Sequence, residues 1–135
     1  MPAYWLFKSE PNTWSWDQHV AAGTAEWDGV RNHQAKNHMI AMKRGDQGMF
    51  YHSGKDKQVV GVVRVAKTYY PDPTDKTGKF GMVDLEVVRT LKSPVTLAQI
   101  KAEPRLSDMV LVRNTRLSVQ PVEPAEWKIV LAMAK

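Results

Sequence analysis

Aromatic and basic side chains are concentrated together in the first half of this chain. Ten of its twelve aromatic residues precede residue 71, and four of its five tryptophans lie within the first 27 residues. Residues 29–45 contain no aspartate or glutamate, but they hold two arginines, two lysines, two histidines and several amide side chains. Because aromatic rings stack on nucleobases and cations bind phosphates, this composition favours a nucleic-acid-binding surface. The alternative is that the rings fill the core and the basic segment is a solvated helix face.

A base flipped out of its strand requires three kinds of side chain: aromatic walls, hydrogen-bonding groups for the base edge, and cations for the flanking phosphates. We expect Trp27 and Tyr70 to form the aromatic walls. The contacts to the base edge would come from Ser9, Glu10, Asn32 and Ser53. The cationic rim would come from Lys8, Arg31 and Lys36. Glu10 would accept from an exocyclic amine, as carboxylates do with cytosine. Trp14 and Trp16 flank a capping serine and Trp127 lies on an apolar helix face, so we assign these tryptophans mainly to packing.

Metal and catalytic motifs are missing from the sequence. His33 and His38 are five residues apart, which places them roughly 140° apart around a helix, and the chain has no cysteine to complete a zinc site. Neither a Gly-x-Ser-x-Gly elbow nor a phosphate-binding loop with its lysine is present. We therefore predict a non-catalytic protein without metal or cofactor. The alternative is a small enzyme acting on a nucleotide or nucleoside, with Glu10, His52 or Asp72 as acid or base.

Length and composition predict a single domain over residues 1–135. The chain is 43% hydrophobic and 24% charged, which is typical of a soluble globular protein. It has no apolar run long enough to cross a membrane and no secretory leader pattern. The lack of cysteine fits a reducing compartment, so we expect a cytoplasmic protein, a monomer with no membrane partner. The formal charge of +5 favours an anionic partner only weakly, and its distribution along the chain carries more information.

Hydrophobic periodicity and turn residues predict mixed helices and strands. We expect strands at Tyr4–Phe7, Gly48–Ser53, Val59–Tyr70, Phe80–Leu91 and Leu117–Val119. We expect helices near residues 15–22, 32–43, 96–103 and 124–133, two of which begin with capping boxes at Ser15 and Thr96. Gly23 and Gly45 are predicted to follow helix ends, and Gly61 to mark a bulge or sharp bend. Because strands and helices do not alternate strictly, we predict an α+β fold with a bent open β-barrel of five or six strands and flanking short helices.

Four sequence strings, in this order and spacing, resemble the EVE domain family of the PUA-like superfamily. They are YWLFKSEP at residues 4–11, WDGVRNHQAKN at 27–37, FYHS at 50–53 and YYPDP at 69–73. The resemblance extends through VVGVVRV at 59–65 and LVRNTRLSV at 111–119, and it covers residues 4–127. Each string alone is a weak indicator, and their joint order makes the assignment specific.

This resemblance implies a PUA-like barrel and a nucleic-acid partner, either RNA or modified DNA. EVE domains are related to the YTH and ASCH domains, which bind RNA. The family is thought to recognise modified bases, and its eukaryotic members are linked to methylated or oxidised cytosine in DNA. The family pocket lies at the mouth of the barrel. Carried onto this chain, it would be framed by Lys8, Ser9 and Glu10; by Trp27, Val30, Arg31 and Asn32; by Tyr51, His52 and Ser53; and by Tyr70, Pro71 and Asp72.

Overall fold

A strongly curved six-stranded sheet, in the order β2-β5-β4-β3-β1-β6, forms the centre of the computed structural model, which describes residues 3–114 and 116–134. Its strands are β1 (Tyr4–Ser9), β2 (Thr24–Glu26), β3 (Gln47–His52), β4 (Gln58–Pro71), β5 (Gly81–Thr96) and β6 (Val119–Val122). The helices are α1 (Trp16–Ala22), α2 (His33–Ala41), α3 (Leu97–Ala102), the 3-10 helix η1 (Pro104–Leu106), α4 (Val110–Arg113) and α5 (Pro124–Met133). β1 and β3 pair in parallel, and the other neighbouring strands pair antiparallel. The predicted α+β fold with an open, bent barrel is confirmed.

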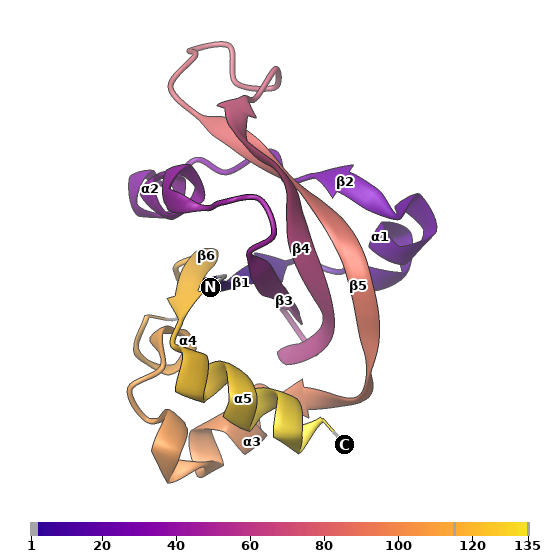
Figure 1. The fold of residues 1–135 in the computed structure, drawn as a ribbon, viewed down its shortest axis with the longest axis vertical. Helices are drawn as coiled ribbons and strands as arrows, with labels where there is room; N and C mark the ends of the chain where they lie inside the picture. Colours follow the sequence, from indigo (N-terminus) through magenta and orange to yellow (C-terminus); the bar gives the residue numbers. More distant parts are fainter. Residues whose placement is uncertain (1–2, 115, 135) are drawn as a thin grey trace.

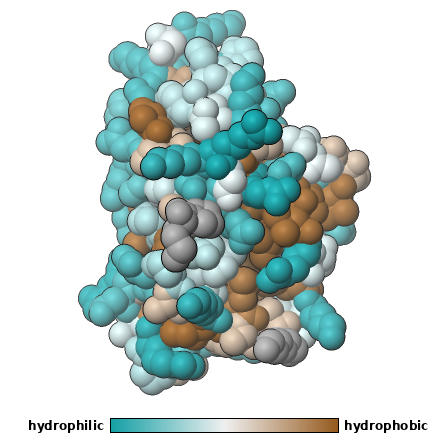
Figure 2. Space-filling view, in the orientation of Figure 1, coloured by the Kyte–Doolittle hydropathy of each residue, from teal (hydrophilic) through white to brown (hydrophobic). Residues whose placement is uncertain are grey.

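The long β4–β5 hairpin gives the molecule its shape. Figure 1 shows both strands running the height of the molecule and projecting beyond it, with α2 beside the hairpin and α3, α4 and α5 gathered at the opposite end. The surface of the projecting end is mostly hydrophilic (Figure 2). Among the described residues, no helix is long and apolar enough to cross a membrane.

Gly61 allows the sheet to bend around an indole ring. A Cβ atom at this position would lie 2.2 Å from Cζ2 of Trp16, so only glycine leaves room for that ring. The register of β4 with β5 shifts between Val59 and Gly61, which confirms the predicted irregularity. Further register shifts along β4 add to the bend, since bulges increase local twist.

Two capping boxes begin helices as predicted. Ser15 accepts from the amide of Gln18, and Thr96 accepts from the amide of Gln99, with the glutamine side chains bonding back in both cases. Gly23 ends α1 with a φ of 76°, a left-handed conformation that favours glycine.

The end of α2 was predicted wrongly. The helix stops at Ala41 instead of Lys43, and Gly45 belongs to the turn into β3, where its amide donates to Val65. The physical reason is Asp46, whose buried carboxylate accepts from the amide of Lys43 and from the indole of Trp5. The sequence also gave no indication of β2, η1 or α4, and it placed the last strand two residues too early.

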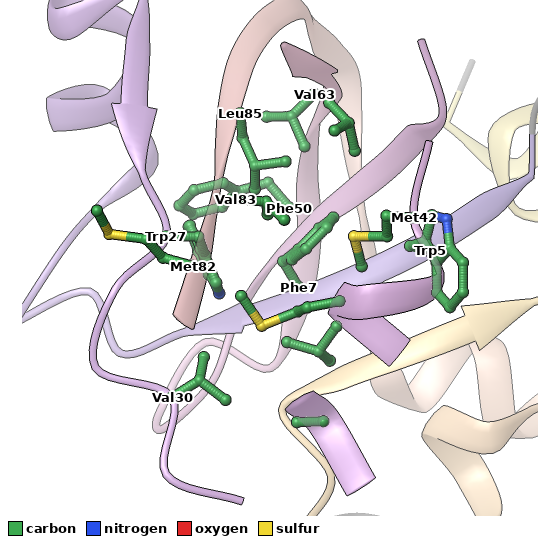
Figure 3. Close-up of a cluster of buried hydrophobic side chains, with 14 of the residues drawn as sticks. Trp5, Phe7, Trp27, Val30, Met42, Phe50, Val63, Met82, Val83 and Leu85 are labelled. Atoms are coloured by element: carbon green, nitrogen blue, oxygen red, sulfur yellow. The ribbon is translucent and has the colours of Figure 1, made fainter. Parts of the chain in front are cut away.

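Two hydrophobic clusters lie on opposite faces of the central strands. The first, here called the aromatic cluster, contains Trp5, Phe7, Trp16, Trp27 and Phe50 with neighbouring valines and methionines (Figure 3). The second, the aliphatic cluster, contains Leu6, Met49, Val62, Ile100, Leu106, Leu111 and Trp127 with further apolar residues. Successive residues of β1 alternate between the two, because side chains of a strand point to opposite faces. The prediction that Trp127 and Trp16 pack in the core is confirmed, since both are buried.

Candidate functional site

A cavity of about 580 Å³ opens beside the aromatic cluster, and its volume is in the range typical of small-molecule sites. It lies between the end of β1, the turn before α1 and the segment that leads from β2 to α2. The described residues that line it are Lys8, Ser9, Glu10, Thr13, Trp14, Ala25, Glu26, Trp27, Asp28, Gly29, Val30 and Ser118.

A tight turn after β1 places one wall of the cavity. The amides of Thr13 and Trp14 both donate to the carbonyl of Glu10, at 2.9 Å in each case. The hydroxyl of Ser9 donates to the carbonyl of Trp14 and closes the turn from the other side. Pro11 lies within this turn, where a residue with a fixed φ prevents continuation of the strand. Trp14 is thereby held at the cavity while the chain enters α1.

Trp27 forms the back of the cavity and is buried at the same time. Its ring meets Phe7 and Phe50 edge-on, with centroids 5.5 Å apart in both pairs (Figure 3). Its amide donates to the carbonyl of Val83 at 2.7 Å, which fixes the backbone against β5. This aromatic wall is therefore rigid before any ligand arrives.

Trp14 is the wall residue that the sequence did not reveal. It is half-buried and lines the cavity, whereas Trp16, two positions later, is fully part of the core. Both flank the capping Ser15, and both were expected mainly to pack in the core. The available indication was that Trp14 precedes the helix, outside its amphipathic repeat.

The cavity is richer in hydrogen-bond acceptors than in cations. Three carboxylates, those of Glu10, Glu26 and Asp28, line it together with one cation, Lys8. Burial lowers the pKa of Lys8, whose Nζ lies 5.9 Å from the centroid of the Tyr51 ring. This arrangement suits a ligand that presents N–H groups, such as the amino edge of a base.

The Glu10 carboxylate packs against the turn that contains Gly54. A Cβ atom at Gly54 would lie 2.5 Å from Oε1 of Glu10, so the carboxylate rests directly against the Gly54 backbone. The adjacent amide of Ser53 donates to the carbonyl of Ser9 at 2.9 Å, which ties this turn to the end of β1.

Asp72 connects the cavity to the β4–β5 loop. Its buried carboxylate accepts from the amide of Gly29 at 2.8 Å, from Arg31 Nη1 at 3.2 Å and from the hydroxyl of Thr74 at 2.6 Å. Burial alone would raise the pKa of Asp72, but the hydrogen bonds from Thr74, Gly29 and Arg31 outweigh it, and the pKa lies below its ordinary value. Asp72 is therefore ionised and positions Gly29, a lining residue.

Two cationic side chains and a histidine surround Phe80 on the far side of this connection. The Arg31 guanidinium lies 5.7 Å and the Lys36 Nζ 5.6 Å from the centroid of the Phe80 ring, and the His33 ring lies at 5.0 Å. We call these four residues the Phe80 group. The predicted basic rim is therefore not part of the cavity lining, except for Lys8.

The predicted site residues divide into two sets. Five of them line the cavity: Lys8, Ser9, Glu10, Trp27 and Val30. The others do not, and they are Arg31, Asn32, Lys36, Tyr51, His52, Ser53, Tyr70, Pro71 and Asp72.

Most residues of the second set have structural partners. Asn32 caps α2 by accepting from the amide of Ala35 at 2.9 Å, and Nε2 of His52 accepts from the amide of Trp16 at 2.9 Å. Tyr51 is buried in the aliphatic cluster. The Tyr70 hydroxyl donates to Asp84. Burial first, and then this bond and the charges of neighbouring carboxylates, raises the pKa of Tyr70.

The residues of the alternative catalytic assignment have different partners in the structure. Glu10 lines the cavity, whereas His52 supports the start of α1 and Asp72 supports the segment before α2. Within residues 3–114 and 116–134, no group of three or more His, Cys, Asp or Glu side chains is arranged to hold a metal ion.

Comparisons with known proteins match the whole of this architecture. Thymocyte nuclear protein 1 of Homo sapiens is 33% identical, over 98% of this chain and 74% of its own length. A Rhodopseudomonas palustris protein solved by NMR is 57% identical with a TM-score of 0.93, covering 98% of this chain and 92% of that one. The human THYN1 protein, crystallised in complex with 5-methylcytosine-containing DNA, is 34% identical with a TM-score of 0.92, covering 98% of both chains.

More distant likeness supports the fold class alone. An ASCH protein of Zymomonas mobilis shares 9% identity and a TM-score of 0.56 over 97% of this chain.

The family model of the EVE domain matches residues 3–133. The resemblance drawn from the four sequence strings is thus confirmed, and this chain belongs to the EVE domain family.

Proposed function

We propose that this chain binds a modified base of a nucleic acid, flipped out of its strand, in the cavity beside the aromatic cluster. The observation that carries the proposal is the similarity to human THYN1, which was crystallised with 5-methylcytosine-containing DNA and is 34% identical over 98% of this chain. A modified cytosine is accordingly the first ligand to test.

The geometry of the cavity supports this function. Trp14 and Trp27 provide aromatic surfaces, and stacking on such rings tolerates any base face. Glu10 and its neighbouring carboxylates provide acceptors for an amino group, which cytosine carries and thymine lacks. Specificity of this kind depends on hydrogen bonds, because hydrogen bonds to charged groups are stronger than those between neutral groups.

The Phe80 group supplies the cationic surface for the phosphates next to the flipped base. It is tied to the cavity through Asp72, which contacts both Gly29 and Arg31. Phosphate contacts add affinity without sequence information, so this surface would strengthen binding to modified and unmodified strands alike.

The remaining features of the proposal follow from the sequence. We propose that residues 1–135 form one domain, of which positions 1, 2, 115 and 135 lie outside the described residues. We further propose that the protein is a cytoplasmic monomer. It would bind RNA or DNA and perform no reaction on the base. His52 and Asp72 are engaged in hydrogen bonds to backbone amides, and this favours binding over catalysis. Incubation with a nucleotide panel, followed by chromatography, would reveal any turnover and thereby reject the non-catalytic assignment.

Fluorescence anisotropy with matched oligonucleotides tests the binding proposal. The pairs differ only in a 5-methyl group on one cytosine, in single- and double-stranded DNA and RNA at one fixed salt concentration. We expect tighter binding of at least one modified strand than of its unmodified partner. Equal affinity for every pair would overturn the assignment of 5-methylcytosine as ligand.

A charge-neutral variant tests the role of the cavity carboxylates. Glu10→Gln keeps the shape of the side chain and removes its charge, so we expect affinity for the modified strand to fall by roughly tenfold, as for loss of a charge-assisted hydrogen bond. The matched control is Asp108→Asn, an exposed carboxylate paired with Arg113 away from the cavity, which should leave affinity unchanged.

A further inference from the structure

His19 is a buried polar side chain that does not line the cavity but contacts Trp14, one of its walls. Its exposed fraction is 0%, and it lies in α1 among the rings of the aromatic cluster. Its Nδ1 lies 2.9 Å from Trp14 Nε1, and its Nε2 lies 2.8 Å from the carbonyl oxygen of Leu85. Both ring nitrogens are therefore occupied, one by the cavity wall and one by β5.

These two partners determine the tautomer of His19. An indole N–H only donates, so Nδ1 must be an acceptor and carry no proton. A backbone carbonyl only accepts, so Nε2 must carry the proton. The ring is accordingly neutral, and a second proton on Nδ1 would face the Trp14 N–H and break that bond.

The surroundings of His19 favour the same neutral form. The Trp16 ring stacks on it with an interplanar angle of 13° and centroids 6.2 Å apart, while Phe50 and Trp27 lie at 5.4 and 6.2 Å. Its ring and hydrogen-bond contacts in the described structure are these rings, Trp14 and the Leu85 carbonyl, none of which is charged. Burial lowers the pKa of His19, although the Leu85 hydrogen bond acts in the opposite direction.

We propose that His19 is a positioning residue for base recognition, which fixes the orientation of the Trp14 indole at the cavity through its Nδ1 and does so only as the Nε2–H tautomer. Trp14 lies in a turn and is half-buried, so packing alone restrains it less than the core tryptophans. The bond to His19 connects it through α1 to the carbonyl of Leu85 in β5. The inference rests on the proposed function only in naming the bound ligand, since the hydrogen bond exists in the free protein.

A purely packing role would be filled better by an apolar side chain. Burying an imidazole costs free energy unless both nitrogens find partners, and here the partners are a cavity residue and the sheet. Removal of the Trp14 N–H should therefore free the orientation of the Trp14 ring at the cavity, just as removal of the His19 acceptor should.

NMR of the free protein tests the hydrogen bond without any ligand. Long-range ¹H–¹⁵N spectra of the His19 ring should show a proton on Nε2 and none on Nδ1 at neutral pH. The Trp14 indole N–H, assigned by its loss in Trp14→Phe, should exchange slowly with solvent in the wild type and faster in His19→Leu. A proton on Nδ1, or an unchanged exchange rate in His19→Leu, would overturn the proposal.

A double-mutant cycle then tests the consequence for binding, with the matched 5-methylcytosine oligonucleotides as probe. We expect His19→Leu and Trp14→Phe each to weaken binding by roughly tenfold, as for one hydrogen bond, and the double variant to be no weaker than the weaker single variant. His19→Asn, which retains an oxygen near the position of Nδ1, should recover part of the affinity. Additive losses, or a folded His19→Leu with wild-type affinity, would overturn the positioning role.

A second histidine provides the matched control. His38 is half-buried in α2 beside Trp5, and it does not line the cavity. His38→Asn should leave both the Trp14 exchange rate and the oligonucleotide affinity unchanged. If no oligonucleotide binds the wild type, the proposed function fails, and the NMR results still decide whether His19 fixes Trp14.

Discussion

The two hydrophobic clusters of this domain share the same strands but differ in what covers them. The aliphatic cluster is covered by α3, α4 and α5 and is built mainly from leucine, valine, isoleucine and methionine. The aromatic cluster is built around tryptophan and phenylalanine rings, includes the neighbouring buried His19, and borders a cavity of about 580 Å³. One side of the sheet therefore stabilises the fold, and the other side also holds the proposed binding surface in place.

This difference explains why rings dominate the cavity side. Large flat side chains fill space beside a cavity without collapsing into it, and their edge-on contacts fix each ring in one orientation. Trp27 meets Phe7 and Phe50 in this way, and a rigid wall needs no ordering when a base binds. Substitutions on the two sides should consequently separate stability from binding.

The largest effect on stability should come from the aliphatic cluster. Leu6 is completely buried there, so Leu6→Ala should lower the free energy of unfolding by about 2–5 kcal/mol. Affinity for a modified oligonucleotide should stay the same while the protein is folded, because Leu6 faces away from the cavity. Urea denaturation and anisotropy at low temperature measure the two quantities. A loss of affinity in the fully folded variant would show that the clusters are coupled.

On the cavity side, Trp14→Ala should lower the affinity for the oligonucleotide more than it lowers the free energy of unfolding. Loss of one stacking ring should weaken binding by about 1–3 kcal/mol, as for other aromatic residues that stack on bases. The free energy of unfolding should fall less than in Leu6→Ala, since Trp14 is only half-buried. A Trp14→Ala protein that unfolds at wild-type urea concentrations but keeps its preference for the modified strand would contradict this assignment.

A smaller effect is expected in the Phe80 group, whose proposed role is to bind phosphates without reading the base. Lys36→Gln should weaken binding to modified and unmodified strands equally and reduce the slope of log affinity against log salt by about 0.9 if one phosphate contact is lost. Lys128→Gln, on α5 at the opposite end of the molecule, is the control. A selective loss for the modified strand would place Lys36 at the base itself.

The smallest effect concerns pH. Because burial lowers the pKa of His19, the unfolded chain binds more protons than the folded protein just below the ordinary histidine pKa of about 6.5. The stabilisation by neutral His19 is complete above that value, and the free energy of unfolding should fall as the pH drops below it. Urea titrations from about pH 7.5 to about pH 5 measure this slope, which should be shallower in His19→Asn. Burial also lowers the pKa of His38, which contributes to the slope in the same direction. The test is therefore the difference in slope between the wild type and His19→Asn, since both contain His38. Identical slopes would mean that His19 does not titrate in this range.

Local rules predicted most of the elements of the fold. The capping boxes at Ser15 and Thr96, the stop at Gly23 and the irregularity at Gly61 all depend on residues close in sequence, and all are confirmed. Elements without a capping residue or turn signal of this kind, such as β2, were not predicted. The short β2 is held by its pairing with β5 some 60 positions away, with Thr24 opposite Glu86, and propensity does not reveal such a partner.

The predicted residues that line the cavity come from two short segments of the chain. Lys8, Ser9 and Glu10 lie at the end of β1, and Trp27 and Val30 precede α2, so their place near element ends was visible in the chain. Trp14 and Trp16 were both expected mainly to pack in the core. What separates them is the turn at Pro11, which holds Trp14 at the cavity, and the bend at Gly61, which admits Trp16 to the core.

The sequence by itself determined the family, the α+β class, the main strands and the concentration of rings and cations in the first half, because these depend on composition, period and local capping. Only the tertiary structure decided which of those side chains meet. Asp72 joins Gly29 and Arg31 across more than forty positions, and His19 receives Trp14 on one nitrogen while donating to Leu85 from the other. The partnerships of Asp72 and of His19 with Leu85 depend on the β4–β5 hairpin and its loop, which bring distant residues within hydrogen-bond range and leave no trace in local sequence.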